Sequence, residues 1–217
     1  MAYLIFNLIA FLIALFAFIF GAVKLFKPKK PLYFKLLICS VGCYALAQLS
    51  GLVYLWCDMI NGVWTWMLGI FGCGMFLVSA NYGAYDSLVD DGTFLKARRE
   101  ALAAPLVFII MIIVIALLWR KTSIFKAIML VVMLGPSVPA SYFSLKHLLL
   151  PMDDFGLLKG TRSCDILQLA FFSAALINAV LLYFSAGTAE GIIELFISIV
   201  LCLLTFAAIK GETIWRT

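Results

Sequence analysis

One polar stripe near the C-terminus offers more chemistry than any other part of this chain. It consists of residues that recur every three or four positions: Glu190, Glu194, Ser198, Cys202 and Thr205. Side chains at this spacing lie on one face of an α-helix. The surrounding sequence is apolar, and a carboxylate in an apolar membrane environment is costly unless it faces a partner, water or the interior of a bundle. We therefore expect the stripe to face other segments of the protein.

Amide side chains in three other apolar segments are candidates to meet this stripe. If successive segments cross a membrane in alternating directions, Asn7, Gln48 and Asn178 lie at a depth similar to that of Glu194. This agreement predicts a small polar pocket that opens outward. Interhelical hydrogen bonds that only hold the bundle together explain the same residues equally well. The predicted ligand-binding residues are Glu194, Asn178, Gln48, Asn7, Glu190 and Ser198.

Seven long apolar runs must position these polar groups. Each run has about 18 or more residues, which at a rise of about 1.5 Å per residue is enough to cross a hydrocarbon core of about 30 Å. Hydrophobic residues make up 65% of the chain and charged residues only 12%, so lipid rather than water is the expected surroundings. We predict an all-α membrane protein with one domain, 1–217, whose seven helices are compatible with a 3+1+3 arrangement. The runs are 3–26, 32–57, 63–82, 102–119, 122–145, 164–185 and 187–209.

The basic residues predict how the chain is oriented in its membrane. The net charge is +5, and 13 of the 16 Lys and Arg residues lie in the first, third and fifth segments between runs or in the C-terminal tail. Cytoplasmic segments are enriched in Lys and Arg, so we expect the N-terminus outside and the C-terminus in the cytoplasm, in a plasma membrane. This pattern gives no reason to expect a nucleic acid partner. The exception is the fourth segment, which carries Arg120, Lys121 and Lys126.

The fifth apolar run contains the sequence GPSVP, with Gly135, Pro136 and Pro139. A proline inside a helix removes one backbone donor and clashes with the preceding turn. Interrupted helices often mark binding sites in membrane transporters, which makes these three residues a predicted hinge. A kink that serves only helix packing is the alternative explanation.

Several enzyme and cofactor classes are disfavoured by the residues present. The chain has one histidine, His147, which we place in a loop, so a zinc or haem site built from several histidines is excluded. Retinal proteins need a lysine midway along the last helix, whereas Lys210 lies at its end. The GxSxG, HExxH and phosphate-loop motifs are absent. We therefore expect no enzymatic activity, no cofactor and no metal.

Three functions agree with these features. Segments 83–101 and 146–163 are the longest between runs, and both are predicted to face the cytoplasm, where a cytoplasmic or membrane protein partner could dock. We favour a receptor or sensor that binds a small ligand in the outer pocket. The alternatives are a passive facilitator of a small neutral or cationic solute and a structural subunit of a membrane complex.

Overall fold

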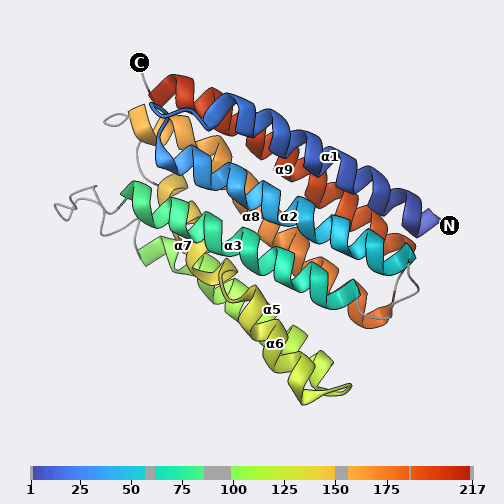
Figure 1. Cartoon of the computed structure of the whole chain (residues 1–217). Coiled ribbons are helices and arrows are strands. Elements are labelled where there is room, and N and C mark those ends of the chain that lie inside the picture. Colours follow the sequence, from blue (N-terminus) through green and yellow to red (C-terminus); the bar gives the residue numbers. More distant parts are fainter. Residues whose placement is uncertain (1, 57–61, 86–98, 150–155, 186, 216–217) are drawn as a thin grey trace.

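All regular secondary structure in the described part of the chain is α-helical (Figure 1). The computed structural model describes the chain except residues 1, 57–61, 86–98, 150–155, 186 and 216–217. The prediction of an all-α fold is confirmed for these residues. The helices are α1 Ala2–Leu25, α2 Leu32–Trp56, α3 Gly62–Tyr85, α5 Ala103–Arg120, α6 Ile124–Leu134, α7 Ser137–Leu149, α8 Gly156–Phe184 and α9 Thr188–Trp215.

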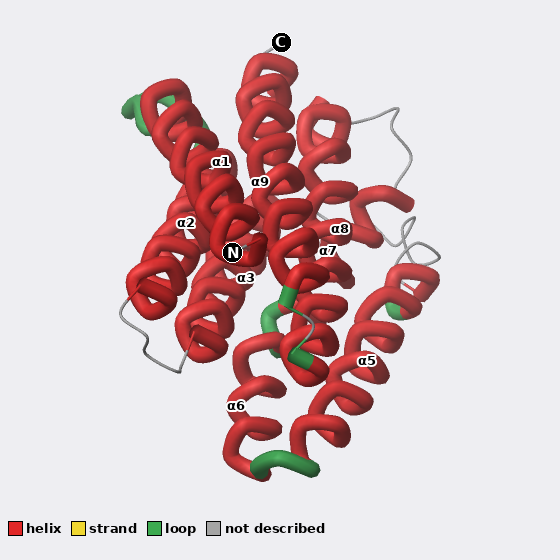
Figure 2. The backbone as a smooth tube through the Cα atoms, turned by 90° about the vertical axis from the view of Figure 1, so that its right-hand side faces the viewer, coloured by secondary structure: helices red, strands yellow, loops and turns green. Residues whose placement is uncertain are grey.

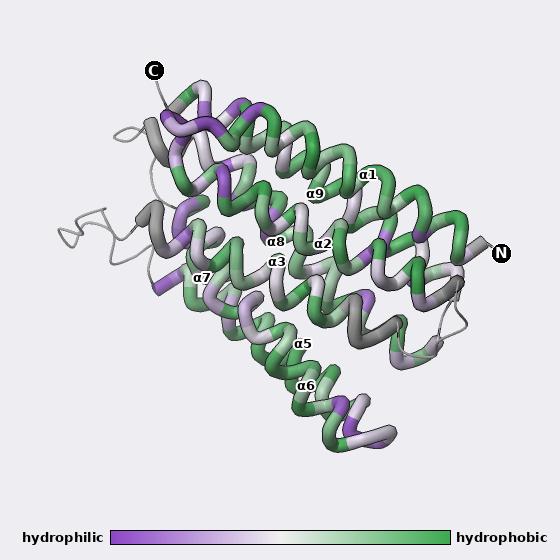
Figure 3. Tube along the Cα trace, in the orientation of Figure 1, coloured by the Kyte–Doolittle hydropathy of each residue, from purple (hydrophilic) through white to green (hydrophobic). Residues whose placement is uncertain are grey.

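The helices have the length and apolar surface of a membrane protein. Six described segments are long and apolar enough to cross a membrane, and Met67–Tyr82 within α3 is a shorter apolar helix. Figure 3 shows apolar residues along the middle of the helices and hydrophilic residues mainly at the end that holds the C-terminus and at the turn between α5 and α6. The six segments are Tyr3–Leu25, Leu32–Tyr54, Arg99–Arg120, Ile124–Leu149, Gly160–Phe184 and Thr188–Ile214.

Two predicted boundaries are wrong. Segment 146–163 was expected to be a loop, but α7 continues to Leu149 and α8 begins at Gly156. His147 consequently lies in α7, with 3% of its surface exposed, and not in a loop. Hydropathy detects only the apolar part of a helix, whereas helical hydrogen bonding continues through residues such as Lys146. Of the other predicted docking segment, 83–101, residues 86–98 lie outside the described part of the chain.

The helices divide into a main bundle and a projecting hairpin. The most extensive contacts are those of α2 with α3, α8 with α9, and α1 with both α9 and α2. The hairpin consists of α5 and α6, which contact each other, while α5 also packs on α7 and α8 and α6 on α3. Figures 1 and 2 show the hairpin extending away from α1 and α9. The turn between α5 and α6 lies at the same end of the molecule as the N-terminus (Figure 1).

Helices α8 and α9 approach each other closely at Gly160 and Gly211. A Cβ atom at Gly160 would lie 2.8 Å from the backbone oxygen of Gly211, closer than real Cβ atoms come to another atom. We expect Gly160→Ala to push the helices apart and lower the free energy of unfolding by about 1–3 kcal/mol. Thermal unfolding of the purified protein in detergent measures this loss. Gly72→Ala is the matched control, because its Cβ atom would meet Cys43 at an ordinary 3.4 Å, and an equal loss in both variants would contradict the prediction.

Candidate functional site

The polar stripe of α9 faces the interior of the bundle as predicted from its spacing. Glu194 is 4% exposed, and Glu190, Ser198 and Thr205 are also buried. Cys202, which shares the spacing, is only partly buried. Because α9 packs on α1, α2 and α8, side chains of these three helices surround the stripe.

Tyr44 of α2 connects the stripe to the amide of Gln48. Its hydroxyl donates a hydrogen bond to the backbone oxygen of Glu194 (3.3 Å) and accepts one from Nε2 of Gln48 (2.8 Å). The Tyr44 ring is fully buried and meets the edge of Phe171 of α8, with 6.4 Å between ring centroids. Tyr44 was not among the predicted site residues, although its spacing of four from Gln48 places both on one helix face.

Two amide side chains from neighbouring helices interact with the carboxyl group of Glu194. Asn178 of α8 and Gln48 of α2 both interact with this carboxyl group, so three predicted residues meet from three helices. Asn178 and Ser198 are completely buried. Neither the amide atoms of Asn178 nor the hydroxyl of Ser198 has a partner at the distance and angle of a standard hydrogen bond among the described residues. Hydrogen-bonding capacity next to Glu194 is therefore left incompletely used.

Tyr3 brings α1 into the same cluster. Its hydroxyl interacts with Glu194, Glu190 and the side chain of Asn7, and Asn7 Nδ2 donates a hydrogen bond to the backbone oxygen of Tyr3 (3.1 Å). Glu190 also supports the start of α9, since its Oε1 accepts a hydrogen bond from the backbone of Gly187 (3.3 Å). Asn7 and Glu190 therefore lie at the edge of the cluster, beside Tyr3.

We call these residues the outer cluster: Tyr3, Asn7, Tyr44, Gln48, Asn178, Glu190, Glu194 and Ser198. It contains two carboxyl groups, and no basic side chain of the described residues forms an ion pair with Glu194. Of the six predicted ligand-binding residues, the most exposed, Glu190, has only 7% of its surface accessible. The cluster is thus a closed, acidic set of side chains suited to a cation or to a donor of hydrogen bonds.

A second buried polar group lies nearer the other end of the bundle and was missed as a unit. We call it the inner cluster, formed by Asn81 of α3, Ser144 and His147 of α7, and Asp165 and Gln168 of α8. Its closest contacts join His147 Nδ1 to Asp165 Oδ1 (3.3 Å) and Asn81 Nδ2 to Gln168 Oε1 (2.9 Å). Ser144 also reaches Gln168 Oε1, at 3.5 Å. The sequence does contain a signal for this cluster. Ser144 and His147 of α7 are three residues apart, as are Asp165 and Gln168 of α8, and this spacing places each pair on one helix face.

An apolar layer separates the two clusters. Gln168 and Asn178 are ten residues apart on α8, which corresponds to about 15 Å along the helix. Phe171, Phe172 and Ala175 lie between them and are buried. The clusters are therefore two distinct polar centres within one bundle.

The predicted hinge residues lie where the fifth apolar run is interrupted. The run is divided into α6 and α7, with Gly135 and Pro136 between them. Pro139 is in the first turn of α7, where a missing backbone donor is tolerated. Pro136 packs against α3 at Gly74, where a Cβ atom would come within 2.8 Å of the proline ring. The interruption is thus packed on the main bundle at a position where only a glycine leaves room.

No described group of three or more His, Cys, Asp or Glu side chains is arranged to hold a metal ion. Comparison with protein families, with curated proteins and with solved structures finds no match to this chain. The functional argument therefore rests on the geometry of the two clusters.

Proposed function

We propose that this polytopic membrane protein is a receptor or sensor whose outer cluster binds a small cationic ligand. The observation that carries the proposal is the buried carboxyl group of Glu194, which lies among amide and hydroxyl groups with no cationic partner among the described residues. A plasma membrane is the expected location, with the outer cluster on the external side.

The physical argument starts from the cost of burying a carboxylate. An ionised carboxylate away from water is strongly unfavourable unless a positive charge or several hydrogen bonds compensate for it. A small cation that enters the cluster would supply that charge. Asn178 and Ser198 would supply hydrogen bonds to the ligand, since neither side chain has a partner at standard hydrogen-bond geometry among the described residues. A ligand amine with two or three N–H donors fits these acceptors best.

A receptor also needs a response at the opposite end of the bundle. Tyr44 of the outer cluster contacts Phe171 of the apolar layer, so the two regions are in direct contact. A shift of α8 on ligand binding would move Gln168 and Asp165 relative to their partners on α3 and α7. The segments 83–101 and 146–163, whose described ends include residues of α3, α7 and α8, are the proposed docking surface for a protein partner.

The proposal predicts that small organic cations raise the unfolding temperature of the purified protein. Choline, putrescine and arginine are suitable probes in detergent, and sodium chloride at equal ionic strength controls for screening. Ligand at 100 times its dissociation constant would stabilise the folded state by about 2.7 kcal/mol. Glu194→Gln should abolish this stabilisation and leave the fold intact, because it keeps the size of the side chain and removes only the charge.

Glu212→Gln is the matched control, since Glu212 is another buried carboxylate of α9 but forms an ion pair with Lys30 at the far end of the helix. A cation response that survives Glu194→Gln but is lost in Glu212→Gln would place the ligand elsewhere. No response to any of the probes would favour the structural subunit over the receptor.

A passive facilitator is the second candidate. The feature that favours it is the continuation of the polar face of α9 beyond Glu194 through the buried hydroxyls of Ser198 and Thr205. Uptake of a stabilising cation into liposomes that contain the protein distinguishes the two functions, because a receptor binds the cation without transporting it.

A further inference from the structure

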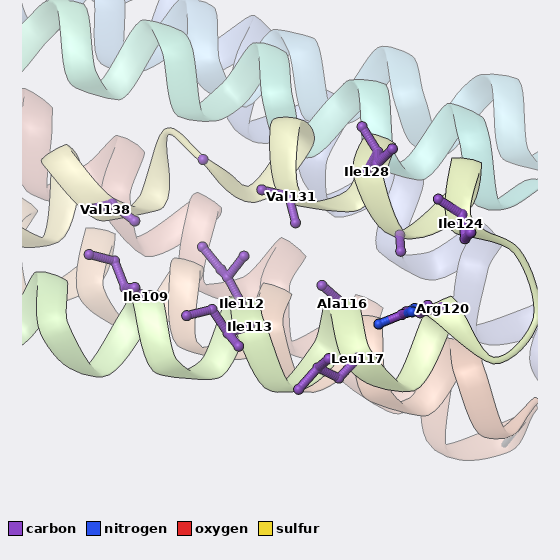
Figure 4. A pocket seen from close by; sticks show the side chains of 12 residues that line it. Ile109, Ile112, Ile113, Ala116, Leu117, Arg120, Ile124, Ile128, Val131 and Val138 are labelled. Atoms are coloured by element: carbon purple, nitrogen blue, oxygen red, sulfur yellow. The ribbon is translucent and has the colours of Figure 1, made fainter.

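An apolar groove runs between the two helices of the projecting hairpin. It has a volume of about 420 Å³ and lies between α5 and α6 (Figure 4). The α5 wall includes Ile109, Ile113 and Ala116, and the α6 wall includes Ile128 and Val131. None of these side chains carries a polar group, so the groove is suited to hydrocarbon.

The groove is open on one side and closed on the other. Ile112 and Ala127 form its floor and are buried, whereas Ile113 and Ile128 on its rims are 52% and 56% exposed. Both helices belong to segments that are long and apolar enough to cross a membrane. The open side of the groove would therefore face lipid chains rather than water.

One end of the groove is basic. Figure 4 shows Arg120 at the end near the α5–α6 turn, beyond Ala116 and Leu117. Lys121 follows in the turn, and Lys126 lies at the start of α6 with its Nζ 5.9 Å from the ring centre of Trp119. None of these three basic residues forms an ion pair with any acidic side chain in the described part of the chain. They are also the residues that depart from the charge pattern expected of an outer segment.

We propose that this groove binds one acyl chain of an anionic phospholipid, whose phosphate is held by Arg120 with Lys121 and Lys126. The distance from Arg120 to Ile109 along α5 is eleven residues, or about 16 Å, a length that suits much of an acyl chain. A guanidinium group at the boundary of the hydrocarbon region is well placed to bind a phosphate through two hydrogen bonds. The basic residues thus select the headgroup, and the isoleucines hold the chain.

A second groove of the same size provides an internal comparison. It lies among α1, α2 and α3, has a volume of about 440 Å³, and includes Leu15, Phe18, Leu46 and Phe76 in its lining. Its lining contains no charged residue. We expect it to accept acyl chains without regard to the headgroup. The difference in headgroup preference between the two grooves therefore measures the contribution of the basic end to lipid binding.

The groove also reaches the interruption between α6 and α7. Gly135 and Val138 contribute to its lining at the end opposite Arg120. A bound acyl chain would therefore contact the point at which the fifth apolar run changes direction.

Native mass spectrometry of the delipidated full-length protein, titrated with phosphatidylglycerol or phosphatidylcholine of identical acyl chains, tests the proposal. We expect one phosphatidylglycerol to bind at least about tenfold more tightly than phosphatidylcholine, because basic residues near a membrane surface favour the binding of anionic lipid. The combined variant Arg120→Gln, Lys121→Gln and Lys126→Gln should remove this preference. Ala116→Leu should weaken the binding of both lipids by narrowing the groove.

Two control variants separate this site from general effects. Lys210→Gln removes a basic residue at the other end of the bundle, and Leu46→Trp alters the second groove; both should retain the preference for phosphatidylglycerol. Equal binding of the two lipids by the unmodified protein would overturn the proposal. So would a preference that survives the triple substitution, or a protein dimer in place of lipid adducts. The result of this experiment is independent of the proposed receptor function, because lipid binding to the groove requires no ligand in the outer cluster.

Discussion

An Asp165→Ala variant is expected to lose up to about 3 kcal/mol of unfolding free energy, because it removes one partner of a buried hydrogen-bonded pair. Asp165 is fully buried, and its Oδ1 lies 3.3 Å from Nδ1 of His147. Thermal unfolding in detergent measures the loss. For a protein of this length it corresponds to a decrease of about 6–12 °C in the unfolding temperature.

A double substitution tests whether the pair itself is responsible. His147→Phe combined with Asp165→Leu replaces both partners by apolar side chains, and Phe at position 147 would retain the stacking on Phe143. We expect the double variant to be more stable than Asp165→Ala alone, since replacing both partners of a buried hydrogen bond by apolar side chains can be nearly neutral. Ser163→Ala, on the exposed side of α8, is the surface control. If Asp165→Ala unfolds at the temperature of this control, the contact between Asp165 and His147 contributes nothing to stability.

The helices were predictable because a helix exposed to lipid requires a long apolar segment, which is visible in the sequence. Residues such as Ile110 and Leu117 of α5 remain exposed in the structure, and apolar residues on every face of a segment are typical of a helix in contact with lipid. The meeting of Glu194, Gln48 and Asn178 was predictable for a related reason. Antiparallel helices of known length place residues at known depths, and polar side chains at equal depth turn toward each other to avoid lipid.

The inner cluster was not predictable by the same reasoning. The charged residues around His147 suggested a loop, because hydropathy cannot distinguish a loop from a helix that continues beyond its apolar part. In the structure His147 lies in α7 and contacts Asp165 of α8, and this contact cannot be read from hydropathy. The hydrogen bonds of Tyr44 were equally hidden, since they depend on the orientation of one hydroxyl group between two helices. The depth of a side chain in the membrane can be counted from a sequence, whereas the specific hydrogen-bond partner that it finds at that depth cannot.

Substituting two residues of the outer cluster is expected to raise the stability of the ligand-free protein. In the combined variant Glu194→Met and Asn178→Leu, apolar side chains of similar size replace a buried carboxylate and a buried amide that has no partner at standard hydrogen-bond geometry among the described residues. An unsatisfied buried polar group costs about 1–3 kcal/mol, so we expect a gain of about 2 kcal/mol. This gain corresponds to an increase of about 4–8 °C in the unfolding temperature. The response to choline, putrescine or arginine should be lost at the same time.

This result distinguishes a binding site from polar side chains that only hold the bundle together. If the outer cluster were structural, removing its hydrogen bonds would lower the unfolding temperature, as expected for Asp165→Ala in the inner cluster. The matched control is Asn81→Leu combined with Gln168→Leu, which removes a buried amide pair that is satisfied at 2.9 Å. Opposite shifts in the two double variants would show that the inner cluster is built for stability and the outer cluster for a ligand. Loss of stability in both would leave the protein with two structural clusters and contradict the receptor proposal.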